Sequence, residues 1–173
     1  GQSSNMTEII ALAKKYDLKV ISDSAQAPGA MYNEKFAGTL ADIGGFSLNR
    51  HKHIHTGEGG IIVTNNKTYA DRMRLIRNHA ELIVEDKGQS ELNNLIGSNF
   101  RFGEIESAIG IQQLKKLSYF VKIRQKVAEK LNDGLKDLKC LQTPLIRNGA
   151  THVYYYYPLT LNTQSLGLSR SSI

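Results

Sequence analysis

The sequence predicts an α/β fold in which helices cover a small sheet. Residues 5–15 carry a helical pattern, and the β-prone run of residues 19–22 follows it and ends at Asp23. Two further β-prone runs, residues 45–48 and 61–64, enclose a loop rich in polar residues. This alternation of helices with short strands is typical of a sheet covered by helices. Ligands gather at the carboxyl ends of strands in such sheets, which directs attention to Asp23 and to the loop.

The first helix is predicted from its cap and its apolar spacing. Asn5 followed by Glu8 is a typical helix start, in which the amide side chain caps the helix and the acid lies in the first turn. Met6, Ile9 and Ala13 then recur at helical spacing. Together these features predict an amphipathic helix that packs one face on the sheet.

Turns and a second helix are predicted further along. Glycines and a proline between residues 28 and 45 predict turns around short strands. Asn66 then leads into a helix whose apolar face includes Tyr69 and Met73. This completes the sequence pattern of a partial α/β domain.

The second half of the chain predicts two helices and one strand. The helical signal weakens from residue 80 to about residue 97, which predicts a mobile or partner-contacting loop. Residues 103–117 are strongly helical, and a longer apolar stripe runs from residue 120 to residue 138, with a break near Leu117. Residues 153–159 predict a tyrosine-rich strand with alternating core and surface positions.

Composition excludes several classes of protein. The net charge is +6, but the basic residues are interspersed with acids along helical stretches, so a nucleic-acid-binding protein is not expected. No apolar run approaches the roughly 18 residues of a membrane span. The single cysteine, Cys140, excludes an internal disulfide framework and fits a reducing compartment. With no secretory signal pattern at the first residues, a cytoplasmic protein is expected.

Asp23, Gln26, Ser47 and Lys52 are the candidate site residues, because they combine a carboxylate, an amide, a hydroxyl and an amine near strand ends. These groups meet the needs of pyridoxal 5'-phosphate (PLP). A lysine amine forms a Schiff base with the cofactor, a carboxylate keeps the pyridine nitrogen protonated, and hydroxyl or amide donors hold the phosphate. From the residues alone, a strand-end aspartate that caps a turn and a solvated loop lysine remain alternatives.

Other polar residues have simpler interpretations. His51, His53 and His55 would share one face of an extended segment and could ligate a metal, but surface or substrate-contacting histidines are favoured and no metal site is expected. Glu58, between glycines, is interpreted as a turn residue. Cys140 is interpreted as a packing residue rather than a nucleophile.

Several segments of the sequence resemble the DegT/StrS family of sugar-nucleotide aminotransferases. They follow one another in the family's order and cover most of residues 8–138. The matching segments are residues 20–27 (VISDSAQA), 45–52 (GFSLNRHK), 56–64 (TGEGGIIVT), 77–79 (RNH), 99–110 (NFRFGEIESAIG) and 113–114 (QL).

The resemblance implies a role for each candidate residue. Asp23 would pair with the pyridine nitrogen, Gln26 would lie near the ring's 3-oxygen, and Ser47 would bind the phosphate. Lys52 would form the Schiff base and act as catalytic acid and base. Asn99 would reach the phosphate of the neighbouring subunit. The implied enzyme is a homodimer that takes an amino group, typically from glutamate, and transfers it to a nucleotide-linked keto sugar.

The resemblance also implies a domain organisation. Residues 1–80 would be the later part of a fold type I large domain, residues 81–117 a connecting loop and helix, and residues 118–173 the start of a small α+β domain. The family's glycine- and threonine-containing phosphate loop and its ring-stacking aromatic would precede residue 1. The chain is therefore expected to be a fragment that binds PLP weakly by itself.

Three alternatives stay open beside this interpretation. A dehydratase branch of the family carries a histidine in place of the lysine, but the fifth residue after Ser47 is Lys52, the aminotransferase arrangement. A PLP-fold regulator without turnover would share the motifs. An unrelated basic α/β binding domain would leave Lys52 as a surface charge.

Overall fold

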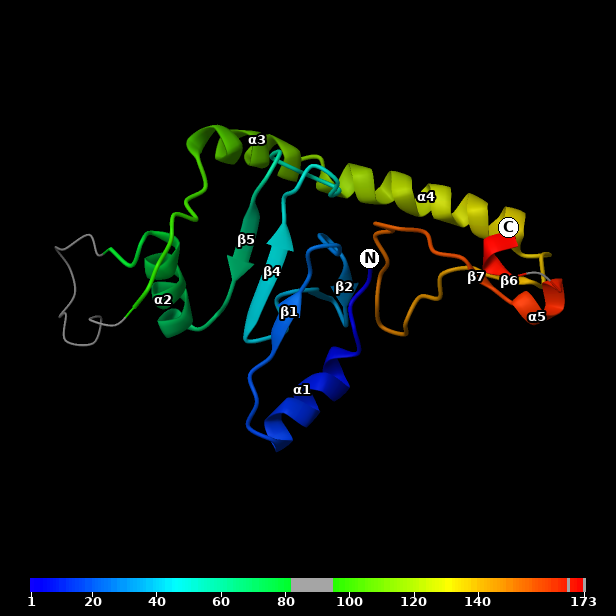
Figure 1. Ribbon diagram of the computed structural model, residues 1–173, viewed down its shortest axis with the longest axis horizontal. Coiled ribbons are helices and arrows are strands. Elements are labelled where there is room, and N and C mark those ends of the chain that lie inside the picture. Colours follow the sequence, from blue (N-terminus) through cyan, green and yellow to red (C-terminus); the bar gives the residue numbers. More distant parts are fainter. Residues whose placement is uncertain (82–94, 168, 173) are drawn as a thin grey trace.

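The computed structural model describes residues 1–81, 95–167 and 169–172. Along the chain the elements are α1 (Met6–Lys15), β1 (Ile21–Asp23), β2 (Met31–Tyr32), β3 (Lys35–Phe36), β4 (Ile43–Ser47), β5 (Gly60–Val63), α2 (Lys67–Arg77), α3 (Glu104–Leu114), α4 (Leu117–Leu135), β6 (Leu141–Gln142), β7 (Thr160–Leu161), α5 (Thr163–Leu166) and the short 3-10 helix η1 (Arg170–Ser172). Figure 1 shows α3 and α4 beyond the end of the sheet where β4 finishes, and α1 toward the opposite end. Most of the loop predicted after residue 80 lies outside the described residues.

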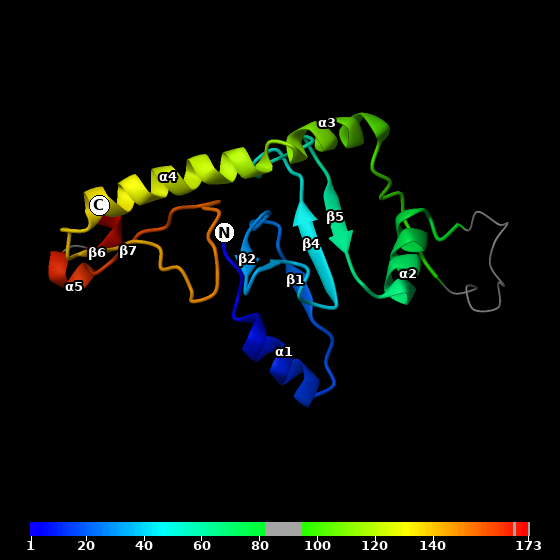
Figure 2. The same cartoon turned by 180° about the vertical axis from the view of Figure 1, so that it is seen from behind.

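A three-stranded sheet, in the order β1-β4-β5, forms the centre of the structure. β1 runs parallel to β4 with Asp23 opposite Gly45, and β5 runs antiparallel to β4 with Gly60 opposite Ser47. Figure 2 shows the same strands from behind. The helices around a partly parallel sheet confirm the predicted α/β class, and β2 and β3 confirm the short strands expected between residues 28 and 45.

Local capping explains where two of the helices begin. The Asn5 side chain accepts a hydrogen bond from the backbone N–H of Glu8 at 3.4 Å, and Asn66 accepts one from the N–H of Tyr69 at 3.1 Å. Both asparagines satisfy backbone donors that have no partner within the first helical turn. The predicted cap at Asn5 is confirmed.

Two adjacent glycines on β4 show that the faces of the sheet differ. A Cβ atom on Gly44 would collide with the backbone carbonyl of Gly38, whereas a Cβ atom on Gly45 would meet no atom within 4 Å. Successive residues of a strand face opposite sides. One side of β4 is therefore closed by the turn at Gly38, and the other side is open in the described structure.

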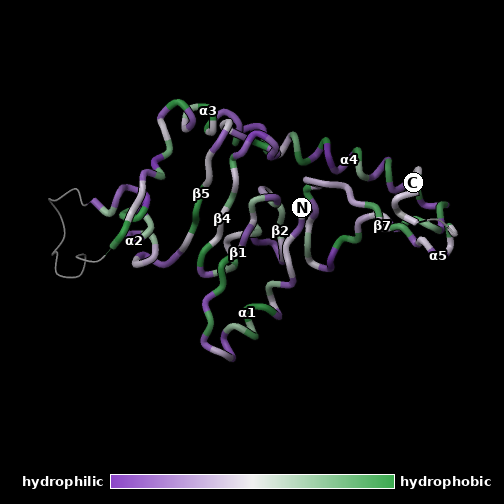
Figure 3. Tube along the Cα trace, viewed as in Figure 1, coloured by the Kyte–Doolittle hydropathy of each residue, from purple (hydrophilic) through white to green (hydrophobic). Residues whose placement is uncertain are grey.

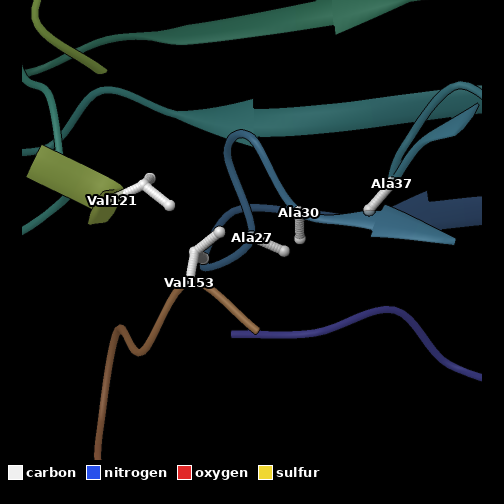
Figure 4. Packing of buried hydrophobic residues seen from close by; sticks show 5 residues of the cluster. All are labelled: Ala27, Ala30, Ala37, Val121 and Val153. Carbon is white, nitrogen blue, oxygen red and sulfur yellow. The ribbon is translucent and has the colours of Figure 1, made fainter. Parts of the chain in front are cut away.

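A small apolar cluster joins the segment after β1 to α4 and to the C-terminal part of the chain. Figure 4 shows its five members, which are Ala27, Ala30, Ala37, Val121 and Val153. Val153 has no exposed surface. Because alanine side chains are small, the backbones in this cluster approach closely, and the segment from residue 24 to residue 37 is held against α4.

The long helices leave much apolar surface uncovered. α3 and α4 lie where helical spacing predicts them, with the break at Lys115 and Lys116 close to the predicted position. Ile105 and Leu114 of α3 are nevertheless 76% and 61% exposed. Figure 3 shows apolar and hydrophilic residues alternating along α4. Periodicity predicted the helices, but the apolar stripe of α3 has no covering segment among the described residues.

The predicted tyrosine-rich strand at residues 153–159 is wrong. This segment has no regular structure up to residue 159, and Tyr154 has a left-handed backbone with φ of 49°. Its backbone donors go to distant or local partners instead of a neighbouring strand: the Val153 N–H donates to the Gly1 carbonyl at 2.7 Å, and the Tyr154 N–H to Nδ1 of His152 at 2.9 Å. Tertiary hydrogen bonds override the β propensity of the tyrosines.

His53 and His152 lie at the junction between this segment and the loop after β4. His53 is buried, and its Nε2–H donates to the carbonyl of Val153 at 2.7 Å. The expectation of three surface or substrate-contacting histidines on one face is therefore wrong for His53. The loop turns rather than extends, so His51 and His55 are exposed while His53 points inward.

Substitutions at the two glycines test the difference between the faces of β4. In the natural protein, Gly44→Ala should lower the free energy of unfolding by about 2–3 kcal/mol, because the methyl group has no room beside Gly38. The matched variant Gly45→Ala should change it by less than about 1 kcal/mol. Denaturant unfolding measures both values. Equal effects of the two variants would contradict this arrangement of the sheet.

The histidine junction predicts that stability decreases in acid. Burial is the main cause that lowers the pKa of His152 from 6.5 to about 4, with a contribution from His53, and burial also lowers the pKa of His53. The unfolded chain then binds more protons than the folded chain between these values, so stability is complete above pH 6.5 and is lost as pH falls.

We expect the free energy of unfolding of the natural protein to be about 1–2 kcal/mol lower at pH 5 than at pH 7.5 because of this junction. His152→Asn should reduce the difference, whereas His55→Asn, at an exposed position, should preserve it. Unfolding curves at the two pH values provide the measurement, and an unchanged difference in His152→Asn would refute the assignment.

Candidate active site

Asp23 and Ser47 end two neighbouring parallel strands. Asp23 is the last residue of β1 and lies opposite Gly45, which is two residues before Ser47 on β4. Paired residues and residues two apart share a face of the sheet, so the side chains of Asp23 and Ser47 leave the sheet on the open side at Gly45. Strand spacing and rise place their Cα atoms roughly 8 Å apart.

The Asp23 carboxylate is exposed and only partly used by the protein. Oδ1 accepts a hydrogen bond from the Ala25 N–H at 3.0 Å, which fixes the side chain over the turn that follows β1. Gln26 lies in that turn and is exposed. Within the described part of the chain Oδ2 accepts no hydrogen bond, so the carboxylate retains an oxygen for a cationic or N–H partner.

Ser47 leads into a closed loop that carries Lys52. The Ser47 hydroxyl accepts a hydrogen bond from the Asn49 N–H at 3.2 Å, and the loop closes where the Leu48 N–H donates to the Gly59 carbonyl at 2.8 Å. The Asn49 amide also donates to the Glu58 carboxylate at 2.7 Å. Glu58 thus holds the two ends of the loop together, a role that its interpretation as a turn residue missed.

Lys52 is half-buried and lies beside the C-terminal segment. Its Nζ atom lies 4.7 Å from the centroid of the Tyr155 ring. The next residue, His53, binds the Val153 carbonyl, and Val153 packs in the same apolar cluster as Ala27. These contacts bring the Lys52 loop to the end of the sheet where the Asp23 turn lies. Sequence reasoning did not find the contacts of His53 and Tyr155, which join residues about 100 positions apart.

Asn99 lies away from the other candidate residues. It forms a backbone bridge with Asn78, directly after α2, and its side chain accepts a hydrogen bond from the Arg101 N–H at 3.4 Å. Arg101 in turn donates to the Asn78 side chain at 3.0 Å. The structure therefore gathers Asp23, Gln26 and the Ser47–Lys52 loop at one end of the sheet and leaves Asn99 beside α2.

Other features of the described residues do not form a competing site. No group of three or more His, Cys, Asp or Glu side chains among them could hold a metal ion. No helix in the described chain is both long and apolar enough to cross a membrane. A cavity of about 670 Å³ lies at the opposite end of the sheet, between Lys14, Val20 and Asp42, and includes none of the candidate residues.

Comparison with known proteins covers the whole chain. The model of the DegT/DnrJ/EryC1/StrS aminotransferase family matches residues 1–173. An uncharacterized protein of Methanocaldococcus jannaschii is 34% identical over 177 residues, with 99% of this chain and 46% of the relative covered. UDP-4-amino-4,6-dideoxy-N-acetyl-beta-L-altrosamine transaminase of Campylobacter jejuni is 33% identical over 161 residues, with 93% and 42% covered.

The fold matches solved structures equally well. The Escherichia coli GDP-4-keto-6-deoxy-D-mannose-3-dehydratase, solved with bound hydrated PLP, superposes with a TM-score of 0.86 at 30% identity, covering 99% of this chain and 46% of that one. The chain spans just under half the length of these relatives. The family model matches every residue, and the superposed structure covers nearly the whole chain. The chain therefore belongs to the DegT/DnrJ/EryC1/StrS aminotransferase family.

Proposed function

We propose that the natural protein is an aminotransferase that transfers an amino group, from glutamate, to the keto group of a nucleotide-linked sugar with PLP as its cofactor. The observation that carries this proposal is the position of three groups at one end of the sheet. A strand-end carboxylate (Asp23), a strand-end hydroxyl (Ser47) and the amine of Lys52 lie on neighbouring elements. The family match and the names of the relatives support the reaction class.

The side chains fit the chemistry of the cofactor. The exposed Asp23 carboxylate would stabilise the protonated pyridine nitrogen, and the Ser47 hydroxyl and the Gln26 amide are donors for the phosphate and the ring oxygen. When bound, PLP supplies an electron sink for the carbon that loses a proton. The open side of β4 at Gly45 leaves space beside these groups.

Lys52 has two roles in the proposal. Its Nζ atom attaches the cofactor in the resting enzyme. Once displaced by the amino donor, the free Nζ atom would take the proton from the donor's α-carbon and pass it to the cofactor. In the second half-reaction it would return a proton from the cofactor to the sugar carbon that comes to bear the amine. An amine can do both because it is nucleophilic and basic when neutral.

The remaining parts of the proposal concern partners and location. Asn99 would serve the phosphate site of a second subunit in a homodimer, since it lies beside α2 and away from Lys52. The net charge of +6 suits an anionic nucleotide-sugar substrate. The single cysteine, Cys140, is consistent with a cytoplasmic enzyme.

Covalent trapping tests the role of Lys52. Borohydride added to the natural protein with PLP should fix the cofactor on Lys52, as located by mass spectrometry of peptides. Lys52→Arg should abolish the label and lower the half-reaction with glutamate by about 10³-fold or more, because arginine cannot act as nucleophile or base. The control Lys122→Arg, on α4, should retain both. A label spread over several lysines would refute the proposal, and release of a sugar hydroxyl without amine formation would identify a dehydratase.

A second test concerns Asp23. Asp23→Asn should reduce kcat for transamination by about 10²–10³-fold, because a neutral amide does not keep the pyridine nitrogen protonated. The control Asp133→Asn removes an exposed carboxylate from α4 and should leave kcat unchanged. Steady-state assays with glutamate and a keto sugar nucleotide provide the comparison. Full activity of Asp23→Asn would remove Asp23 from the site.

A further inference from the structure

We propose that Tyr155 is a positioning residue of the active site, whose aromatic ring holds the Lys52 amine while that amine is protonated and detached from the cofactor. This inference rests on the proposed function for the role of Lys52. The contact between the two side chains is observed independently of that role.

The geometry of the pair is that of a cation–π interaction. Lys52 Nζ lies 4.7 Å from the centroid of the Tyr155 ring, and both residues are half-buried. The face of an aromatic ring is electronegative and attracts an ammonium group, more strongly where water is partly excluded. Lys15 and Tyr16 form a similar pair at 5.3 Å, but both residues are exposed at the end of α1. The described residues therefore include a half-buried and an exposed example of the same contact.

The ring of Tyr155 is fixed in place by its neighbours. Two residues earlier, the buried Val153 accepts the hydrogen bond from His53 at 2.7 Å. The Tyr155 ring lies 5.9 Å from the His53 ring, and the Tyr156 ring meets it edge-on at 4.4 Å. Because His53 directly follows Lys52, the segment from Val153 to Tyr155 binds two consecutive loop residues. A change in the loop therefore moves the amine and its aromatic contact together.

This arrangement addresses a requirement of the proposed reaction. The amine of Lys52 leaves the cofactor in each half-reaction and has to return, and its four-carbon stem would otherwise explore many conformations. A ring face confines the ammonium group without forming a covalent bond to it or exchanging a proton with it. The attraction is weak enough for the amine to leave the ring and return to the cofactor. The ring, and not the Tyr155 hydroxyl, carries this role, so phenylalanine should replace tyrosine.

Amine labelling of the cofactor-free natural protein tests the contact directly. Lys52 should react with acetic anhydride about three- to tenfold faster in Tyr155→Leu than in the wild type, because the amine loses its attraction to the ring and becomes more accessible. Tyr155→Phe should stay within about twofold of the wild type. Mass spectrometry quantifies each lysine, with Lys122 as the internal reference. In the matched control, Tyr16→Leu, Lys52 should label as in the wild type.

The loaded protein provides the second readout. Tyr155→Leu should lower kcat for transamination by about three- to tenfold with little change in KM for the nucleotide sugar, and Tyr155→Phe should restore kcat. Equal Lys52 labelling in wild type and Tyr155→Leu, or a Tyr155→Phe variant that behaves like Tyr155→Leu, would overturn the inference. Borohydride trapping tests the proposed function separately. If PLP is not trapped on Lys52 of the wild type, the proposed function fails, whereas the acetic anhydride result on the cofactor-free protein still tests the contact with Tyr155.

Discussion

The parallel pairing of β1 with β4 is the constraint on which the rest of the structure depends. It sets Asp23 opposite Gly45 and thereby places a carboxylate and the Ser47 hydroxyl on one side of the sheet. Because Gly44 has no side chain, the backbone of the turn at Gly38 can pack against β4 and close its other side. The side of β4 at Gly44 is therefore closed and the side at Gly45 is open. The side chains of Asp23 and Ser47 lie on the open side.

A second constraint positions the amine. The loop between β4 and β5 is closed by backbone hydrogen bonds and by the Asn49–Glu58 pair, so its shape is determined locally. Its orientation is determined from a distance, because His53 binds a carbonyl 100 residues further along the chain. The carbonyl belongs to Val153, which is buried in the apolar cluster against α4. Packing of the C-terminal segment therefore contributes directly to where Lys52 lies.

How far the sequence predicts this structure depends on whether an interaction is local. The helix cap at Asn5 and the strand ending at Asp23 follow from neighbouring residues, and both are confirmed. The irregular backbone of residues 153–159 is set by hydrogen bonds to His152 and to Gly1, and β propensity does not predict these bonds. The sequence also did not predict the burial of His53. The prediction that the three histidines share one face required an extended backbone, which the loop does not adopt. The cofactor-binding roles of the site residues came from resemblance and stay predictions.

The position of Asn99 supports a shared site in the proposed enzyme. The sheet order is β1-β4-β5, and Asn99 forms its isolated backbone bridge with Asn78, directly after α2. Figure 1 shows α2 on the far side of β5 from β1. The Asn99 side chain accepts a hydrogen bond from the Arg101 N–H, and among the described residues none of its hydrogen bonds goes to Ser47. In the proposed homodimer, a phosphate held at Ser47 would instead meet the Asn99 of the second copy, which would give each subunit a part in its neighbour's chemistry.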